Sequence, residues 1–264
     1  MKASKIFFFY NTKLDPAASA FISAYGITNP SQKAAINNLV LDLKSPTYGT
    51  LWTNVFTGMP IHPFVGGTAS AHAGNLRNPG VNDISFSGGW THSSTGALPN
   101  GTTGFASDSF VPSVGQVLNN NGFSIYLGTN NTTAGYDIGV SDGVGYSRLA
   151  GYFGGIIPKA DINGVTVQTG ATRSDGFFSV VNVTSVLDIL YWNGAEIKRT
   201  SGSGPTGLPT IAMYYGALNT TGTAGYFSNR QIRFGCKHTS LTAQQSSDLY
   251  TIIQKFQTAL GRNV

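Results

Sequence analysis

The chain has 264 residues and carries 16 Lys and Arg against 11 Asp and Glu, a net charge of +5. Only 10% of the residues are charged, 34 are glycine and one is cysteine, which excludes an intrachain disulfide framework and a surface built from salt-bridged helices. The basic residues are scattered, so we expect a solvated surface and no nucleic-acid-binding patch, and no stretch reaches the roughly 20 apolar residues of a membrane span.

Residues 1–13 are expected to form an N-terminal arm. Two lysines precede an apolar run that is too short for the core of a signal peptide. Such a run could add a strand to the edge of a neighbour's sheet or pack on its own domain, and the sequence leaves both open. The expected attachment residues are Ile6, Phe7, Phe8, Phe9 and Tyr10.

Residues 14–47 predict a helical lead-in. A first helix is expected from Pro16 to about Tyr25, before a glycine that tolerates the left-handed backbone. A second helix begins at Pro30, with Asn29 as its N-cap and Gln32 completing a capping box. Its apolar stripe follows helical spacing at Ile36, Leu39, Val40 and Leu43.

Residues 48–264 are expected to form one all-β domain. Short apolar runs alternate with Gly, Asn, Ser and Pro clusters, and no helix separates them, which indicates a two-sheet antiparallel jelly-roll sandwich. Asn163-Gly164 and Asn193-Gly194 are type I′ hairpin signals. The expected strands are Asp83–Phe86, Phe123–Thr129, Tyr136–Val140, Arg148–Phe153, Val165–Thr169, Phe177–Val183, Val186–Trp192, Glu196–Arg199, Ile211–Ala217 and Ile232–Cys236.

A closing helix is predicted at residues 242–260. Thr242 and Gln245 form a capping box, and Gly261 follows at the C′ position. An apolar stripe from Leu249 to Leu260 requires a sheet to pack against. Cys236, in an apolar stretch before this helix, is expected to be a buried, inert thiol.

Catalytic patterns are sparse. Glycoside hydrolysis usually needs two carboxylates across the scissile bond, and Glu196 is the single glutamate. Asp137 and Asp142 could form a pair, but they bracket a glycine-rich turn where Asp commonly makes local hydrogen bonds. We therefore expect no catalytic residues and a non-enzymatic protein.

No metal or cofactor is expected from the spacing of possible ligands. The histidines lack zinc-site spacing, although His62 and His72 flank a Gly-Gly pair and could meet in space. Calcium stays open as a weak alternative, because oxygen donors gather in one region. These donors are Asn130, Asn131, Asp137 and Asp142.

Several aromatic residues adjoin glycine or a turn, as in sugar sites where an aromatic face meets the apolar face of a sugar ring. The alternative is an ordinary position in the core or rim of the sandwich. The residues in such positions are Trp90, Tyr136, Tyr146, Tyr152 and Tyr226. The expected glycan-binding set is Trp90, Tyr136, Asp137 and Tyr152.

A family resemblance is carried by five stretches of the sequence: Ala24–Lys44, Pro63–Pro79, Gly88–Gly104 (GGWTHSSTGALPNGTTG), Phe227–Gly235 (FSNRQIRFG) and Leu241–Val264. Together they resemble a lectin-like domain of bacteriophage structural proteins, similar to the laminin-G and concanavalin A jelly roll. The resemblance covers residues 17–264. It implies a tail- or capsid-associated virion protein and carries no catalytic residue to this chain.

Two functions follow as hypotheses. The first is a non-enzymatic virion surface protein, made in the host cytoplasm, acting as a tail-fibre-like adhesin or a capsid decoration in contact with host glycans. Its expected partners are other virion proteins and copies of itself, without nucleic acid or membrane insertion. The second is a free-standing carbohydrate-binding or carbohydrate-cleaving protein. The fold alone does not separate them.

Overall fold

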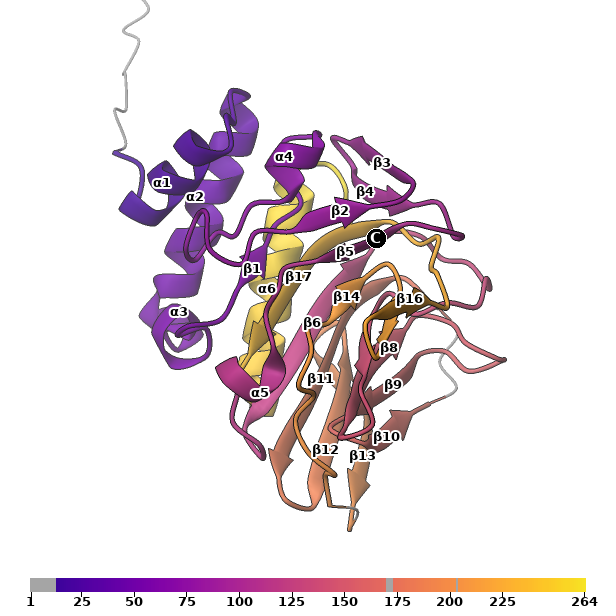
Figure 1. Ribbon diagram of the computed structural model, residues 1–264. Coiled ribbons are helices and arrows are strands. Elements are labelled where there is room, and N and C mark those ends of the chain that lie inside the picture. Colours follow the sequence, from indigo (N-terminus) through magenta and orange to yellow (C-terminus); the bar gives the residue numbers. More distant parts are fainter. Residues whose placement is uncertain (1–12, 170–172, 203) are drawn as a thin grey trace, which may run out of the picture.

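In the computed structural model, which describes residues 13–169, 173–202 and 204–264, two β-sheets stack face to face with helices on one side (Figure 1). The predicted sandwich is therefore confirmed. The arm residues 6–10, expected to attach the chain to a partner, lie outside the described residues.

The first sheet has eight strands and forms the middle layer. β17 pairs with β6, and β6 with β11, all antiparallel. In order, the strands are β13 (Ala195–Ser201), β12 (Leu187–Trp192), β11 (Gly176–Thr184), β6 (Asn121–Leu127), β17 (Ile232–His238), β4 (Gly96–Pro99) and β3 (Trp90–Ser93), with β1 (Ile61–His62) beside β17.

The second sheet has nine strands and forms the outer layer. All its pairs are antiparallel except that of β15 with β7, which is parallel. In order, the strands are β10 (Val165–Gln168), β9 (Lys159–Ile162), β8 (Tyr146–Ala150), β7 (Ile138–Ser141), β14 (Tyr214–Tyr215), β5 (Phe105–Ser107) and β2 (Ser85–Ser87), with β15 (Leu218–Thr220) and β16 (Thr223–Gly225) as a hairpin beside β7.

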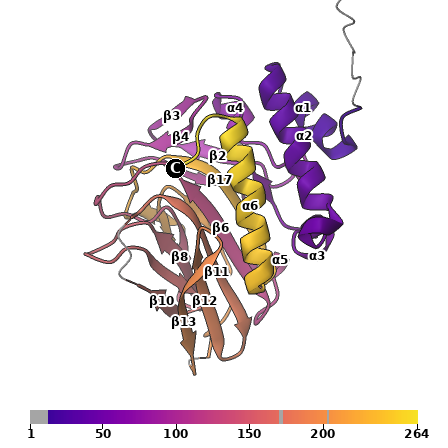
Figure 2. The same ribbon diagram turned by 180° about the vertical axis from the view of Figure 1, so that it is seen from behind.

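Helices cover the other face of the eight-stranded sheet. Figure 2 shows the closing helix α6 lying along that face, beside the N-terminal helices. The helices are α1 (Pro16–Ala24), α2 (Pro30–Lys44), the 3-10 turn η1 (Pro46–Tyr48), α3 (Leu51–Asn54), α4 (Ala69–His72), α5 (Pro112–Gly115) and α6 (Ala243–Ala259). Among these helices, none is long and apolar enough to cross a membrane.

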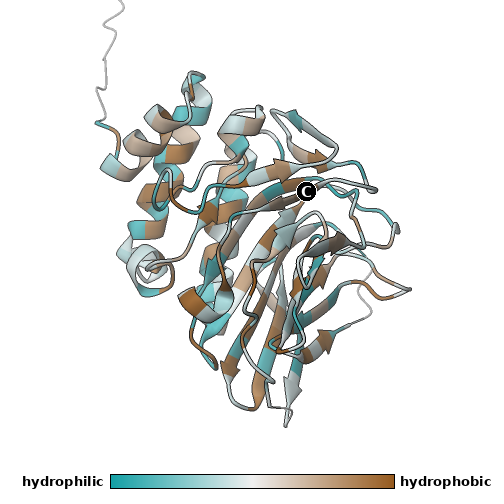
Figure 3. Ribbon diagram, viewed as in Figure 1, coloured by the Kyte–Doolittle hydropathy of each residue, from teal (hydrophilic) through white to brown (hydrophobic). Residues whose placement is uncertain are grey.

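Two apolar cores follow from this layering. One lies between the helices and the eight-stranded sheet, and joins Phe21 and Leu39 to Phe177 and Phe256. The other lies between the sheets. Brown stretches recur along the long strands in Figure 3, and β6 is buried along its whole length because the middle sheet has a core on each face. The helical lead-in therefore shares the core of the sandwich.

The predicted helix starts and hairpins are confirmed. Asp15 and Asn29 cap α1 and α2 with their side chains. Thr242 and Gln245 form the full capping box of α6. Asn163 and Asn193 have φ of 50° and 48°, and each is followed by a glycine with positive φ, as a type I′ turn requires.

Four details differ from expectation. No helix was expected between the strands, yet the short helices α3, α4 and α5 lie among β1 to β6 or just before them. Gln32 does not return the reciprocal bond of a capping box within the described residues, and Asn29 alone caps α2. The strand expected over 148–153 is β8 at Tyr146–Ala150, because a glycine-rich turn begins at Gly151. The strand expected over 211–217 shrinks to Tyr214–Tyr215, since Gly216 has a positive φ of 76°.

Asp188 in β12 gives a stability prediction. Its side chain is fully buried, Oδ1 accepts from Asn182 at 2.9 Å, and Oδ2 has no partner among the described residues. Burial raises the pKa of Asp188 to about 6, despite the opposing hydrogen bond from Asn182. Asp188→Asn removes a buried charge, so we expect the free energy of unfolding at pH 7 to rise by about 1–2 kcal/mol.

Urea titrations at pH 7 and pH 5 check this expectation. The advantage of Asp188→Asn should shrink at pH 5, where the carboxyl of the folded wild type is largely protonated. An Asp188→Asn variant that is less stable than wild type at pH 7 would contradict it.

Candidate functional site

The outer face of the nine-stranded sheet presents one row of side chains across five strands. Cross-strand pairing aligns Tyr214 with Gly139, Gly139 with Arg148, Arg148 with Asp161, and Asp161 with Thr166. The residues between them in each strand face the inter-sheet core, for example Leu149. In Figure 1, β8, β9 and β10 lie on the side of the molecule away from the helices. This row therefore faces outward, on the side without covering helices.

An aromatic cluster borders the row, beside the β15–β16 hairpin. Tyr136 and Phe153 are stacked with ring centroids 4.8 Å apart. The ring of Tyr226 lies 6.1 Å from Tyr136 and 5.8 Å from Phe153. Tyr136 is only 2% exposed, whereas Tyr226 is 61% exposed. The cluster thus has a buried floor and one ring that projects into solvent.

Tyr226 also has an unusual backbone. Its φ is 51°, the left-handed region that bulky residues rarely occupy. Its carbonyl accepts a hydrogen bond from the N–H of Tyr136 at 2.9 Å. A large apolar ring held in water on a strained backbone gives the folded chain little stability, and such residues gather at binding sites.

Arg148 lies in the row next to this cluster. Its guanidinium carbon lies 5.0 Å from the ring centroid of Tyr136 and 4.8 Å from that of Tyr146. Nε donates to Asp161 at 2.7 Å. Burial opposes the charge, but the bond to Asp161 prevails and raises the pKa of Arg148. The cation is therefore held between two aromatic rings.

A buried ion pair fixes the segments that lead to the aromatic cluster. Arg230 and Asp137 are both fully buried, and Nε of Arg230 lies 2.9 Å from each carboxylate oxygen. The Nη groups of Arg230 donate to the carbonyls of Thr133 at 2.6 Å and Gly135 at 2.5 Å. This pair joins the backbone before Tyr136 to that after the β15–β16 hairpin.

Four residues were expected to bind glycan, and the structure does not gather them into one exposed site. Tyr136 forms the buried floor of the cluster, and Asp137 lies beneath it with no exposed surface. Tyr152 is half-buried in the turn after β8. Trp90 lies in the other sheet, where its indole N–H donates to two backbone carbonyls at 3.1 Å. Asp137 is thus a structural residue that no ligand can reach.

The two aspartates weighed for catalysis are both used as acceptors within the protein, and Asp137 is fully buried against Arg230. The Oδ1 atom of Asp142 accepts from the backbone of Val144 and Gly145, both at 3.0 Å, and its other oxygen accepts from Thr210. This is the turn chemistry expected from the sequence. The acceptor contacts outweigh burial, and the pKa of Asp142 is lowered.

The oxygen donors considered for calcium point toward hydrogen-bond donors of the protein. Asn130 accepts from Ser174 at 3.0 Å, and Asn131 and Asp137 both accept from Arg230. A cation at the same place would meet the charge of that arginine. In the described part of the chain, no three His, Cys, Asp or Glu side chains group as metal ligands.

The four histidines lie in helices or strands. His62 does not meet His72: its ring contacts Asp108 at 3.2 Å. The Nδ1 atoms of His72 and His92 lie 2.9 Å apart. The Gly67 N–H donates to Nε2 of His72 at 3.3 Å, so the proton between the two rings belongs to His72.

Cys236 is buried as expected, and burial raises its pKa to about 12.

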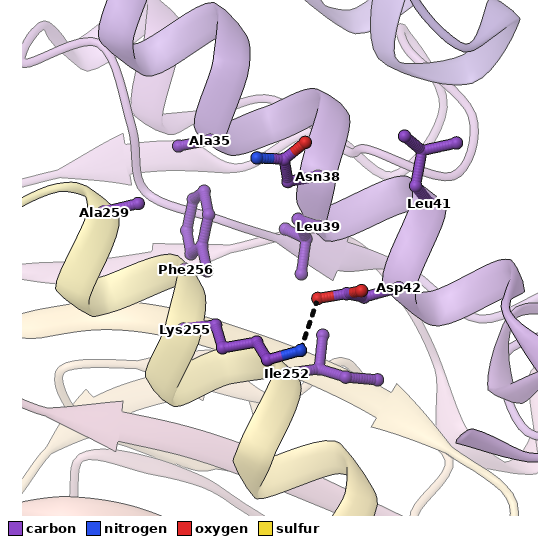
Figure 4. Close-up of a pocket in the computed structure, with 9 residues that line it drawn as sticks. All are labelled: Ala35, Asn38, Leu39, Leu41, Asp42, Ile252, Lys255, Phe256 and Ala259. Carbon is purple, nitrogen blue, oxygen red and sulfur yellow. Dashed lines mark hydrogen bonds and ion pairs between the residues drawn. The ribbon is translucent and has the colours of Figure 1, made fainter. Parts of the chain in front are cut away.

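A hollow of about 330 Å³ lies between α2 and α6. Figure 4 shows Leu39 and Phe256 on its two sides and Lys255 reaching toward Asp42, with 3.4 Å between Nζ and Oδ2. Phe256 is only 3% exposed. The hollow offers no open aromatic face for a sugar ring, so the aromatic cluster is the better candidate site.

Sequence reasoning missed the charged part of the site. Arg148, Asp161 and Lys159 come from neighbouring strands, and only the pairing register brings them together. Alternation within β8 shows that Arg148 lies opposite the core. It does not show which residues stand beside it.

By its fold, the chain is a two-sheet β-sandwich with helices on one face, and all but one of its strand pairs are antiparallel. No protein-family model and no curated protein matches the sequence. Among solved structures, it is similar to domain 4 of AbnA, an extracellular GH43 arabinanase from Geobacillus stearothermophilus, in complex with arabinotriose. The identity is 13%, over 72% of this chain and 96% of that one, with a TM-score of 0.47.

It is also similar to sialidases. The Trypanosoma rangeli sialidase shares 16% identity over 74% of this chain and 33% of its own, with a TM-score of 0.44. NanB sialidase from Streptococcus pneumoniae shares 13% over 63% of this chain and 27% of its own, with a TM-score of 0.42. The chain thus spans a third or less of these sialidases, and the likeness concerns the fold.

Proposed function

We propose that this chain binds carbohydrate through the outer face of the nine-stranded sheet, with Tyr226 as the stacking residue. The observation that carries this proposal is the ring of Tyr226, 61% exposed and held at a φ of 51° above Tyr136 and Phe153. An aromatic face receives the C–H face of a sugar, and nearby polar groups receive its hydroxyls. Thr166 is exposed in the neighbouring row.

Tyr226→Gly is expected to weaken glycan binding at least tenfold, or about 1.4 kcal/mol, with little change in stability. Glycine removes the ring and accepts a positive φ without strain. A glycan array followed by titration of the best ligand measures the affinity, and urea unfolding measures the stability.

Thr221→Gly is the matched control. Thr221 is exposed in the turn of the adjoining β15–β16 hairpin with a φ of 48°, so this change relieves a similar strain without removing an aromatic ring. It should leave the affinity unchanged. If Tyr226→Gly binds every glycan as tightly as wild type does, Tyr226 is not the stacking residue.

We further propose that the protein binds sugar without cleaving it. Asp137 and Asp142 both accept hydrogen bonds from the protein. This supports the proposal, because neither carboxyl is then free to act as an acid beside the aromatic cluster. A reducing-sugar assay on each bound glycan tests this. Release of sugar that depends on either aspartate would overturn it.

The role at a bacteriophage surface, as a tail adhesin or capsid decoration, is a finer proposal. It rests on the sequence resemblance of residues 17–264 to phage structural domains, and a glycan-binding face suits a host-contact protein. Mass spectrometry of purified particles tests it. If the chain is absent from the particles, the virion role fails and the glycan-binding proposal stands.

A further inference from the structure

Arg148 has unused hydrogen-bonding capacity, in contrast to the arginines buried elsewhere. Arg230 and Arg262 use Nε, Nη1 and Nη2 on protein acceptors. Arg148 uses Nε alone, on Asp161. Its Nη1 and Nη2 make no hydrogen bond to another residue in the described part of the chain. Its side chain keeps 23% of its surface exposed.

The surroundings hold this guanidinium in one orientation. Asp161 is fully buried and accepts also from the hydroxyl of Thr166, at 2.6 Å. Tyr136 and Tyr146 lie against the guanidinium at 5.0 and 4.8 Å. An arginine fixed through Nε presents its remaining N–H groups as a planar fork, which matches the two oxygens of a carboxylate.

The local charge also favours an anion. Asp161 balances Arg148, and Lys159 adds a second cation on the adjoining strand, with Nζ 4.8 Å from the ring of Phe153. Phe153 in turn contacts Tyr226. One exposed aromatic ring and one arginine fork therefore border the buried Tyr136, and the lysine lies against Phe153, which is stacked on Tyr136.

We propose that this face selects acidic glycans, with the carboxylate of a uronic acid-type sugar on the free Nη groups of Arg148. Tyr226 would receive a neighbouring ring, and Lys159 would add charge without a fixed geometry. This inference rests on the proposed glycan-binding function and names its ligand class.

The experiment compares oligogalacturonate with its fully methyl-esterified form, and includes neutral arabinan and dextran oligosaccharides. Titration of the full chain should show about 10–100-fold weaker binding of the ester, because one charge-assisted pair is lost. The affinity for the acid should also fall as salt is raised. Equal affinity for acid and ester would overturn the inference.

Arg148→Gln should abolish the preference for the acid, while Arg148→Lys, which keeps the charge but loses the fork, should keep only part of it. Arg199→Gln is the control, because Arg199 is exposed on β13 and paired with Glu196 at 2.7 Å. Lys159→Gln leaves Asp161 paired, and should weaken binding of the acid a few-fold. Retention of the full preference in Arg148→Gln would also overturn the inference.

The outcomes separate the two proposals. Neutral glycans bound through Tyr226 without preference for acid would end the inference and leave the proposed function intact. No binding of any glycan on the array would end both.

Discussion

Asp137→Asn is expected to lower the free energy of unfolding by about 3–5 kcal/mol at neutral pH. The change leaves Arg230 charged and fully buried with a neutral partner. The carboxylate also accepts from Ser228 and from the N–H of Gly151, the latter at 2.7 Å. Urea unfolding followed by tryptophan fluorescence measures the loss.

Asp142→Asn provides the comparison, because Asp142 also accepts several N–H groups but lies in a partly exposed turn and has no cationic partner among the residues that the structure describes. We expect a loss below about 2 kcal/mol there. The double variant Asp137→Leu with Arg230→Met should be more stable than Asp137→Asn, since no unpaired charge stays buried. Equal losses in the two single variants would show that the buried ion pair contributes no more to the free energy of unfolding than the hydrogen bonds of Asp142 do.

The prediction also concerns the candidate site. Arg230 holds the carbonyls of Thr133 and Gly135, in the segment that leads into Tyr136. If the ion pair positions this tyrosine, Asp137→Asn should weaken glycan binding even where the variant is still folded. Asp142→Asn should not.

The fold was predictable to the extent that local chemistry determines it. Thr242 and Gln245 specify a capping box from four residues of sequence, and Asn193-Gly194 specifies a hairpin from two. The short strands were not predictable. β14 is only Tyr214–Tyr215, and it exists because β5 and β7 pair with it on either side.

The candidate site was predictable in its residue types but not in their roles. Tyr136 and Asp137 adjoin each other in sequence, yet one forms the floor of an aromatic cluster and the other pairs with Arg230, 93 residues away. No residue near Asp137 in the sequence indicates that Arg230 is its partner. Likewise, Arg148 and Asp161 meet through cross-strand pairing, and their contact depends on a register that the sequence pattern leaves open.

Acidification from pH 6.5 to 4.5 is expected to lower the free energy of unfolding by about 3 kcal/mol. Burial lowers the pKa of His72 to about 3 and that of His238 to about 4. Above pH 6.5 both imidazoles are neutral in both states. Below it the unfolded chain binds two protons that the folded chain does not, which costs about 1.4 kcal/mol per histidine and pH unit.

Asp188 opposes this loss. Its raised pKa of about 6 means that the folded chain binds a proton before the unfolded chain does, which adds about 1.4 kcal/mol per pH unit below pH 6. Two histidines outweigh one aspartate, so the net slope keeps the sign of the histidines. Carboxyls with a lowered pKa, such as Asp108 and Asp142, add to the loss mainly below the window of the experiment.

Urea titrations at half-unit pH steps measure the slope, and two variants separate its parts. His238→Gln leaves His72, with a smaller contribution from His92, against Asp188, so the dependence on pH should become much weaker. Asp188→Asn removes the opposing group, so the slope should roughly double. A wild type whose stability stays constant over this window, or two variants that both parallel it, would contradict the assignment, because the buried imidazoles would then bind protons as readily as exposed ones.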